Sequence, residues 1–203
     1  REALACVETE QLDLAILDIM LPDMSGFDLC RRIREKHTYP VIMLTAKDGE
    51  MDKITGLTLG ADDYITKPFR PLEMVARVKA QLRRYKKYNP AHGAEEAGEI
   101  MEHAGLVLNA KTHECLLDEQ PLALTPTEFS LLRILLENKG NVVSAEELFH
   151  QIWKDEYYTK NNNTITVHIR HLREKLRDSV EHPRFIKTIW GVGYKIETHP
   201  SKG

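Results

Sequence analysis

The sequence predicts two domains, an α/β domain built on a parallel sheet and a smaller α+β domain. Up to residue 85, short apolar runs typical of buried strands alternate with amphipathic segments typical of helices. After residue 99, short strand-like pieces come first, and three helical segments and a hairpin follow them. A chain of 203 residues is long enough for two domains of ordinary size.

The composition indicates a globular protein and leaves its partners open. Hydrophobic residues make up 42% of the chain, and a formal net charge of -3 neither indicates nor excludes a nucleic-acid partner. Cys6, Cys30 and Cys115 lie far apart without a CxxC pair, so neither a disulfide framework nor a zinc knuckle is expected. No apolar run approaches the roughly 20 residues that span a bilayer. We therefore expect a cytoplasmic protein with no membrane partner.

The first two segments are a helix and a buried strand. Residues 1–11 carry Leu4 and Val7 at helical spacing, and because residue 1 is Arg rather than Met, we expect further sequence upstream. The apolar run at 14–18 indicates a strand buried on both faces, as a parallel sheet flanked by helices requires. It ends at the carboxylate of Asp18, and turn residues follow. A helix-capping or turn-forming Asp is the alternative reading of this residue.

Strand and helix then alternate up to residue 85. The expected order is a helix at Gly26–Lys36, a strand at Val41–Thr45, a helix at Glu50–Gly60, a strand at Tyr64–Lys67 and a helix at Pro71–Tyr85. Because parallel strands need crossover connections, this alternation predicts a parallel sheet.

Three strand ends bring different chemistry to one edge of that sheet. Asp18, Thr45 and Lys67 supply a carboxylate, a hydroxyl and an ammonium group at the carboxyl ends of successive strands. A carboxylate can accept a phosphoryl group covalently, while an ammonium and a hydroxyl can bind its oxygens. A phosphatase of the haloacid dehalogenase type also uses a strand-end Asp, but it needs a second acid where Met20 stands. We therefore do not expect an enzyme.

The second half is expected to form a winged helix after a linker. The predicted organisation is a domain at 1–86, a linker at 87–99 rich in Ala, Gly and charge, and a domain at 100–198. Residues 100–124 suggest a small antiparallel sheet, and a capping box at Thr125–Glu128 begins the first of three helices. A glycine-containing hairpin is expected at Phe185–Ile196. Three helices followed by such a hairpin make a winged helix.

The third of these helices has a polar face suited to DNA. Its apolar stripe consists of Ile165, Ile169, Leu172 and Leu176. Steps of about 100° per residue place the following residues opposite or beside that stripe: Thr164, Val167, His168, Arg170, His171, Arg173 and Glu174. Positive charge at the edges suits phosphates, and methyl groups with a donor suit base edges. A solvated surface and a metal pair formed by His168 and His171 are the alternatives.

The first domain closely resembles bacterial response-regulator receiver domains. The resemblance lies in LDIMLPDMSG at 17–26, LTA at 44–46 and GADDYITKPF at 60–69. It implies a flavodoxin-like parallel sheet that lacks its first strands in this chain. It further implies that Asp18 is the phosphoacceptor, that Thr45 and Lys67 contact the phosphoryl group, that Tyr64 is the switch aromatic, and that the Lys67–Pro68 peptide is cis.

The same resemblance implies a Mg²⁺ ion in the full-length receiver. Its ligands would be Asp18, the backbone carbonyl of Met20 and an acidic pair that follows the first strand of the family. Glu8, Glu10 and Asp13 follow no apolar strand, so they are not that pair, which is absent from this chain. Since Mg²⁺ is usually held by one or two carboxylates together with phosphate, we expect its binding to be weakened here.

The second domain closely resembles OmpR/PhoB-type effector domains. LTPTEF at 124–129, TITVHIRHLR at 164–173 and WGVGY at 190–194 carry the resemblance. By position, Thr166, Val167 and His171 should lie toward bases and Trp190 in the wing. The residues expected toward phosphates are Asn163, His168, Arg170, Arg173 and Thr188. KHTYP at 36–40 and DKITGLT at 52–58 narrow the resemblance to VanR-type regulators of vancomycin-resistance operons.

The resembling subfamily also forms a symmetric dimer when it is phosphorylated. The residues expected on that dimer face are Lys53, Ile54, Leu57, Asp62, Asp63, Glu73, Val75 and Arg77. A solvated charged surface is the alternative. The expected partners are a sensor histidine kinase, a second copy of the chain, promoter repeats in double-stranded DNA and RNA polymerase. The sequence thus predicts a phosphorylated transcription factor, with a constitutive DNA-binding module whose receiver is non-functional as the alternative.

Overall fold

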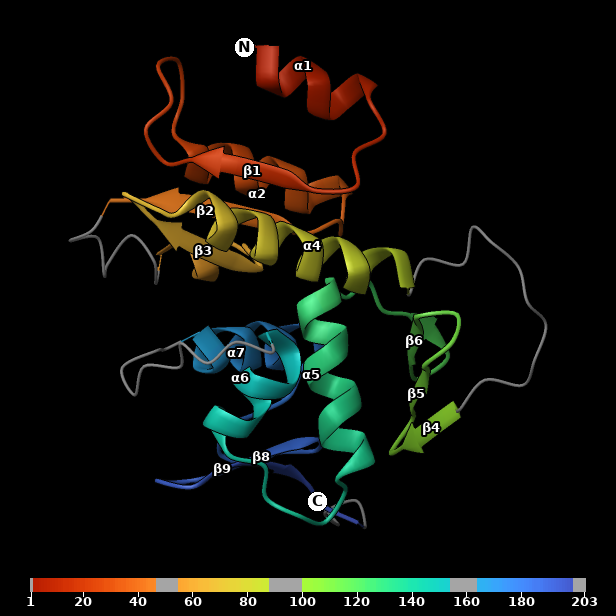
Figure 1. Ribbon diagram of the computed structural model, residues 1–203. Coiled ribbons are helices and arrows are strands. Elements are labelled where there is room, and N and C mark those ends of the chain that lie inside the picture. The colour runs from red at the N-terminus through yellow and green to blue at the C-terminus, as the bar shows by residue number, and fades with distance from the viewer. Residues whose placement is uncertain (1, 47–54, 88–99, 154–163, 199–203) are drawn as a thin grey trace. The chain divides into compact units, whose positions relative to one another are not determined.

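The computed structural model describes residues 2–46, 55–87, 100–153 and 164–198. The chain divides into two compact units, Arg1–Lys87 and Tyr88–Gly203. The elements of both units are labelled in Figure 1, and each unit is taken by itself below. Most of the predicted linker, the start of the predicted helix at Glu50–Gly60 and the predicted cap at 161–163 lie outside the described residues.

The first unit is built on the predicted parallel sheet. Its strands are β1 (Ala15–Asp18), β2 (Val41–Thr45) and β3 (Asp63–Thr66), in the order β1-β2-β3 with both pairs parallel. The described helices are α1 (Glu2–Thr9), α2 (Gly26–Lys36) and α4 (Pro71–Lys87) (Figure 1). The α/β class and the parallel sheet expected from the alternation of elements are therefore confirmed.

The core of this unit lies between α2 and the sheet. Leu29, Cys30 and Ile33 recur at helical spacing on α2 and are fully buried together with Val41 and Met43 of β2. Burying one such side chain contributes roughly 1.5–3 kcal/mol. The amphipathic stripe of α2 thus holds the middle strand of the sheet, which is the strand that both edge strands pair with.

A glycine at the start of α2 brings that helix close to the end of β1. A Cβ atom added to Gly26 would lie 2.1 Å from the carbonyl oxygen of Asp18, which no other residue type tolerates. Ser25 caps the helix by accepting a hydrogen bond from the Phe27 amide. The turn from Asp18 to α2 is therefore tightly packed, and it supports the carboxylate at the end of the strand.

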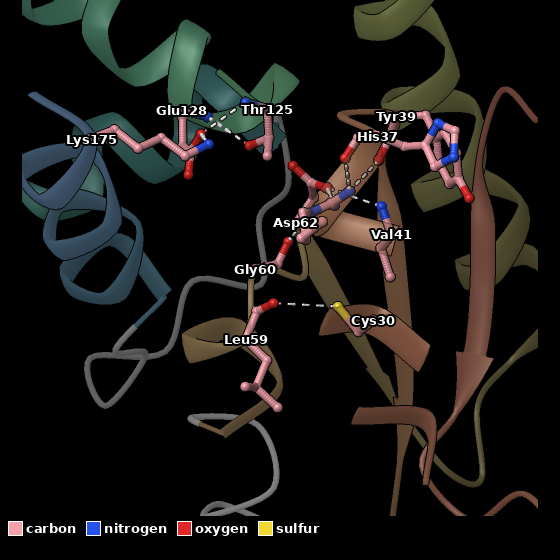
Figure 2. Close-up of polar contacts among 11 residues, drawn as sticks. Cys30, His37, Tyr39, Val41, Leu59, Gly60, Asp62, Thr125, Glu128 and Lys175 are labelled. Atoms are coloured by element: carbon pink, nitrogen blue, oxygen red, sulfur yellow. Dashed lines mark hydrogen bonds and ion pairs between the residues drawn. The ribbon is translucent and has the colours of Figure 1, made fainter. Parts of the chain in front are cut away.

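The amino edge of the sheet, where β2 and β3 begin, is held by an ion pair between Arg34 and Asp62. Asp62 and its neighbours Tyr39, Val41 and Gly60 are labelled in Figure 2. Arg34 Nη2 lies 2.6 Å from Asp62 Oδ2, and the Val41 amide donates to the same oxygen at 2.9 Å. The guanidinium also donates to the carbonyl oxygens of Gly60 at 2.6 Å and Tyr39 at 2.8 Å. One side chain therefore links the end of α2 to the starts of both β2 and β3.

The second unit begins with a small antiparallel sheet, as predicted. Its strands are β4 (Ile100–His103), β5 (Leu106–Asn109), β6 (Glu114–Leu117) and β7 (Gln120–Pro121), paired in chain order. The helices α5 (Pro126–Glu137), α6 (Ala145–Trp153) and α7 (Thr164–Leu176) follow. The hairpin of β8 (Ile186–Ile189) and β9 (Gly193–Ile196) completes the predicted winged helix (Figure 1).

A buried carboxylate connects α5 to α7 in this unit. Thr125 and Glu128 form the predicted capping box, in which Glu128 Oε2 accepts from the Thr125 amide at 2.8 Å. The same oxygen accepts from Lys175 Nζ of α7 at 2.6 Å (Figure 2). Lys175 also donates to the Ala123 carbonyl at 3.0 Å. The amino end of α5 is thereby tied to the last turn of α7.

We expect Arg34→Ala to destabilise the first unit by roughly 3 kcal/mol, because it leaves the fully buried Asp62 carboxylate without its cation. Hydrogen exchange of the β2 amides, followed by mass spectrometry, measures the loss locally. Arg31→Ala is the matched control, since Arg31 and its partner Asp28 are 65% and 52% exposed and their loss should change stability by less than about 0.5 kcal/mol. Equal protection of β2 in wild type and Arg34→Ala would contradict this role.

Candidate functional site

The carboxyl edge of the parallel sheet brings together the three strand ends predicted to bind phosphate. Asp18 ends β1 opposite Leu44, and Thr45 ends β2 opposite Thr66, the last residue of β3. Lys67 follows Thr66 directly, and its amide donates to the Thr45 carbonyl at 2.7 Å. The register therefore places the carboxylate, the hydroxyl and the ammonium group at neighbouring positions along one edge.

Asp18 and Lys67 are in direct contact at this edge. Lys67 Nζ forms a hydrogen-bonded ion pair with Asp18 Oδ2, and the Met20 amide donates to Asp18 Oδ1 at 3.2 Å. The Lys67 hydrogen bond is the main reason why the pKa of Asp18 lies below its ordinary value, while partial burial acts in the opposite direction. Asp18 is therefore ionised at neutral pH, and both groups remain about one-third or more exposed.

Of the remaining two predicted residues, Thr45 lies at this edge, and Tyr64 lies further back on β3, opposite Met43. Thr45 is buried, and its hydroxyl donates to the Ala46 carbonyl at 3.3 Å. Tyr64 is half-buried and packs against the core of the first unit. The Lys67–Pro68 peptide is cis, as the resemblance implied. The direct contact thus involves Asp18 and Lys67, and Thr45 is a near neighbour whose hydroxyl bonds locally.

This edge suits an anionic group that carries several oxygens. An ionised carboxylate can act as a nucleophile, and an adjacent ammonium group can neutralise charge on an incoming phosphoryl group. A resident Mg²⁺ ion fits less well. In the part of the chain that the structure describes, no three His, Cys, Asp or Glu side chains gather into a group that could hold a metal. Asp18 and the Met20 carbonyl alone fall short of the oxygen ligands that Mg²⁺ prefers.

The predicted dimer face is partly surface and partly core. Lys53 and Ile54 lie outside the described residues. Leu57 and Asp62 do not reach the surface, because Leu57 is buried and Asp62 is held inside by Arg34 and the Val41 amide. On α4, Val75 is exposed, while Arg77 contacts Asp63 at 3.2 Å and Glu73 at 3.2 Å. Asp63 is itself buried, so Val75, Glu73 and Arg77 form the part of the face that reaches the surface among the described residues.

In the second unit, α7 presents a narrower polar face than its periodicity predicted. Thr166, Arg170 and Glu174 are exposed, and His171 is half-buried. Arg170 Nε lies 3.0 Å from Glu174 Oε1. The following predicted contact residues are instead buried: Thr164, Val167, His168 and Arg173. Asn163 lies outside the described residues. The prediction of an exposed position is therefore wrong for these four buried residues.

The burial has a physical cause, which is that α7 packs on two sides. His168 faces the ring of Trp153 in α6, with 6.0 Å between ring centroids. On the other side, Arg173 Nη2 donates to the Ile186 carbonyl at 2.7 Å and to Thr188 Oγ1 at 2.8 Å. Arg173 thus holds the wing strand β8 against α7. Thr188, predicted to face phosphate, is half-buried as the acceptor of this bond.

Tyr194 is a residue that sequence reasoning did not assign to the site. Its hydroxyl lies 3.2 Å from Thr166 Oγ1 on the polar face of α7, so it connects β9 to the first turns of that helix. Its place in the WGVGY run at 190–194 marked the wing but did not predict this partner. Trp190 lies at the turn between β8 and β9, as expected for the wing, and is highly exposed.

Comparison with known proteins assigns both units. The family profile described as "Response regulator receiver domain" matches residues 1–79, and the one described as "Transcriptional regulatory protein, C terminal" matches residues 119–196. The chain is 68% identical over 198 residues to "Regulatory protein VanR" of Enterococcus faecium, a match that covers 97% of this chain and 84% of that relative. It is 54% identical to "Regulatory protein VanRc" of Enterococcus gallinarum over 96% of this chain and 84% of that one.

A solved structure of a mutant of the protein RitR has the same fold. Its TM-score is 0.68 at 28% identity, and the match covers 97% of this chain and 83% of that one. Among the described residues, none of the helices is long and apolar enough to cross a membrane.

We expect Lys67→Met to raise the pKa of Asp18, because the hydrogen bond that chiefly lowers it is removed. The pair stabilises the folded state above the ordinary carboxyl pKa, and this contribution disappears as the pH falls through the lowered pKa of Asp18. Titration of the side-chain carboxyl ¹³C signal measures the change. Asp118, whose pKa is lowered by Arg184 in the second unit, is the internal control and should not move. An unchanged Asp18 titration would contradict the assignment.

Proposed function

The chain belongs to the two-component response regulators of the OmpR/PhoB type, and we propose that phosphorylation of Asp18 by a sensor histidine kinase controls its binding to promoter DNA. The chain is a DNA-binding transcriptional regulator with a receiver and a winged-helix domain. The observation that carries the proposal is the ionised Asp18, paired with Lys67 at the carboxyl edge of the receiver sheet.

The chemistry assigned to this edge is a phosphoryl transfer. An oxygen of the Asp18 carboxylate attacks phosphorus, the bond from phosphorus to the donor's imidazole nitrogen breaks, and the imidazole leaves with the bonding electron pair and takes up a proton. Lys67 then pairs with the new phosphoryl oxygens instead of the free carboxylate. Thr45 would turn its hydroxyl from the Ala46 carbonyl toward the same oxygens. Tyr64 would move inward into the space that Thr45 leaves.

Magnesium is expected in receivers of this family, and we assign it no step in this chain. Asp18 and the Met20 carbonyl would be two of its ligands, but the described residues supply no acidic pair beside them. A bound Mg²⁺ ion would add neutralisation of phosphoryl charge. In its place, the described residues offer the Lys67 ammonium group.

DNA contact is assigned to the exposed face of α7. Arg170 is a phosphate contact, because it is highly exposed and its one described ion pair, with Glu174, is at the surface. Thr166 and His171 are the residues assigned to base edges, since a methyl group with a hydroxyl and an imidazole donor can read the major groove. We assign no direct contact to Thr164, Val167, His168 and Arg173, because they are buried.

Dimerisation would use the α4 side of the receiver. Val75 supplies an exposed apolar centre. Glu73 and Arg77 supply charges that pair within one copy and can exchange partners between copies, while the buried Asp63 holds Arg77 from below. Two copies would then bind promoter repeats and meet RNA polymerase. The genes under control are proposed to be vancomycin-resistance genes, on the strength of the 68% identity to VanR.

A second function is favoured by one observation. The described residues at the receiver edge contain a single carboxylate in contact with Lys67, and no group able to hold a metal. A receiver edge that holds no metal would be phosphorylated slowly or not at all. The chain would then act as a phosphorylation-independent DNA-binding module.

An experiment that distinguishes the two functions is to incubate the full chain with a small acyl phosphate donor in the presence of Mg²⁺. We expect wild type to gain the mass of one phosphoryl group and Asp18→Asn to gain none, because the amide is not a nucleophile. Intact-mass spectrometry makes the measurement, and Asp23→Asn is the control at a neighbouring carboxylate. A phosphoryl adduct that persists in Asp18→Asn would exclude this residue as acceptor, while an unmodified wild type would support the phosphorylation-independent module.

We expect Arg170→Ala to weaken binding to any duplex and to lower the slope of log affinity against log salt by about 1, the loss of one phosphate contact. Fluorescence anisotropy of a labelled mixed-sequence duplex over a range of salt concentrations gives the slope. Arg173→Ala is the matched control, because its guanidinium is bonded to the wing and should affect affinity without this change in slope. Equal slopes for wild type and Arg170→Ala would remove Arg170 from the phosphate contacts.

A further inference from the structure

We propose that Tyr194 fixes the side chain of Thr166 so that its methyl group, and not its hydroxyl, faces the DNA, and that α7 thereby selects thymine at one base step. Tyr194 is a positioning residue in this scheme, since it acts through Thr166. The inference rests on the proposed contact of α7 with DNA. It names the chemical group that Thr166 reads, which is the 5-methyl group of thymine.

Thr166 carries two groups of different chemistry in the first turn of α7, where its side chain is exposed. The hydroxyl can donate to or accept from a base edge, whereas the methyl group can make only apolar contacts. Threonine in a helix divides between two rotamers, which differ in where the hydroxyl lies. Which of the two groups is available to DNA therefore depends on what holds the hydroxyl.

The hydroxyl of Thr166 is held by the phenol of Tyr194. Thr166 Oγ1 lies 3.2 Å from the Tyr194 hydroxyl, and one of the two hydroxyls donates to the other. In the part of the chain that the structure describes, this is the only side-chain hydrogen bond of either residue. If Thr166 turned its hydroxyl toward a base, the phenol of the largely buried Tyr194 would lose its partner, which is unfavourable. The bond therefore favours the arrangement that leaves the methyl group free.

Tyr194 is itself held in place by contacts on both sides of β9. Its side chain is only 8% exposed, and its backbone amide and carbonyl both bond to Val143, each at 2.9 Å. Thr188 lies opposite Tyr194 in the pairing of β8 with β9, and its hydroxyl accepts from Arg173 of α7 at 2.8 Å. The phenol therefore has little freedom to follow Thr166 if that side chain rotates.

A fixed methyl group makes Thr166 more selective than a free hydroxyl would. A threonine hydroxyl can bond to donors and acceptors on most base edges, so by itself it distinguishes bases poorly. Thymine is the base that displays a methyl group in the major groove, and a threonine methyl is one of the apolar groups that contact it. His171, assigned to the same face of α7, would supply the hydrogen bond that Thr166 does not make.

The test compares thymine with deoxyuridine, which has the same hydrogen-bonding edge but lacks the methyl group. The full chain first selects its preferred duplex from a randomised pool. Each thymine of that duplex is then replaced singly, and fluorescence anisotropy measures the affinities. We expect wild type to lose roughly fourfold at one thymine of each repeat, the effect of one buried methyl group. Thr166→Ser, which lacks the methyl group, should bind the thymine and deoxyuridine duplexes equally at that position.

Tyr194→Phe tests the positioning role, because it removes the hydroxyl and leaves the ring in the core. The ratio of thymine to deoxyuridine affinity at that position should fall below about twofold, since Thr166 is then free to rotate. Adding Thr166→Val to Tyr194→Phe should restore the ratio, because valine presents a methyl group at both positions. Thr188→Val removes another hydroxyl of the wing and is the matched control, with the ratio of wild type expected. Thermal unfolding of each variant checks that the second unit is folded.

Four results would overturn the proposal. A wild type that binds the selected duplex equally well after every replacement would exclude the methyl contact and leave the other base contacts of α7 in place. A full ratio in Thr166→Ser would assign the methyl group to another residue. An unchanged ratio in a folded Tyr194→Phe variant would remove the positioning role. A wild type that enriches no sequence from the pool would overturn the base contacts proposed for α7 as well.

Discussion

The parallel register of β1, β2 and β3 is the constraint on which the receiver depends. Parallel strands end at the same edge, so the residues that follow each strand become neighbours although they are far apart in the chain. Asp18 and Lys67 meet there as an ion pair, and the Thr45 hydroxyl lies on the strand between them. The strands thereby position the pair on regular structure, and this limits its freedom before any ligand arrives.

The amino and carboxyl edges of the sheet each carry an ion pair, and the two pairs differ in burial. At the amino edge, Arg34 is almost fully engaged by Asp62 and by backbone carbonyls, so its charge serves to hold the fold together. At the carboxyl edge, Lys67 and Asp18 remain partly exposed and have few other partners among the described residues. A buried pair that is fully satisfied resists change, while an exposed pair can exchange its partner for an anion. This difference in burial separates the structural pair from the pair to which we assign phosphoryl transfer.

The winged helix follows the same division between anchoring and contact. Lys175 joins α7 to the capping box of α5 through Glu128, and Arg173 joins it to the wing through Thr188. Two of the basic residues of α7 are thus used to orient the helix. Arg170 remains at the surface, where we propose that it contacts DNA. Different residues of α7 therefore have different roles. Buried residues orient the helix, and a few exposed residues are assigned to DNA recognition.

The sequence by itself determined the order of elements, the strand ends that carry Asp18, Thr45 and Lys67, and the capping box at Thr125 and Glu128. These features are local, because periodicity, turn residues and capping depend on residues that are near in the chain. Only the tertiary structure decided which polar residues are available. From the sequence, Arg173, His168 and Asp62 would all be expected at the surface. Each is buried in the structure by an element that is distant in the chain. A helical projection of the sequence identifies only the apolar face of α7 as buried. In the structure, polar residues beside that face are buried as well, because both α6 and the wing pack against them.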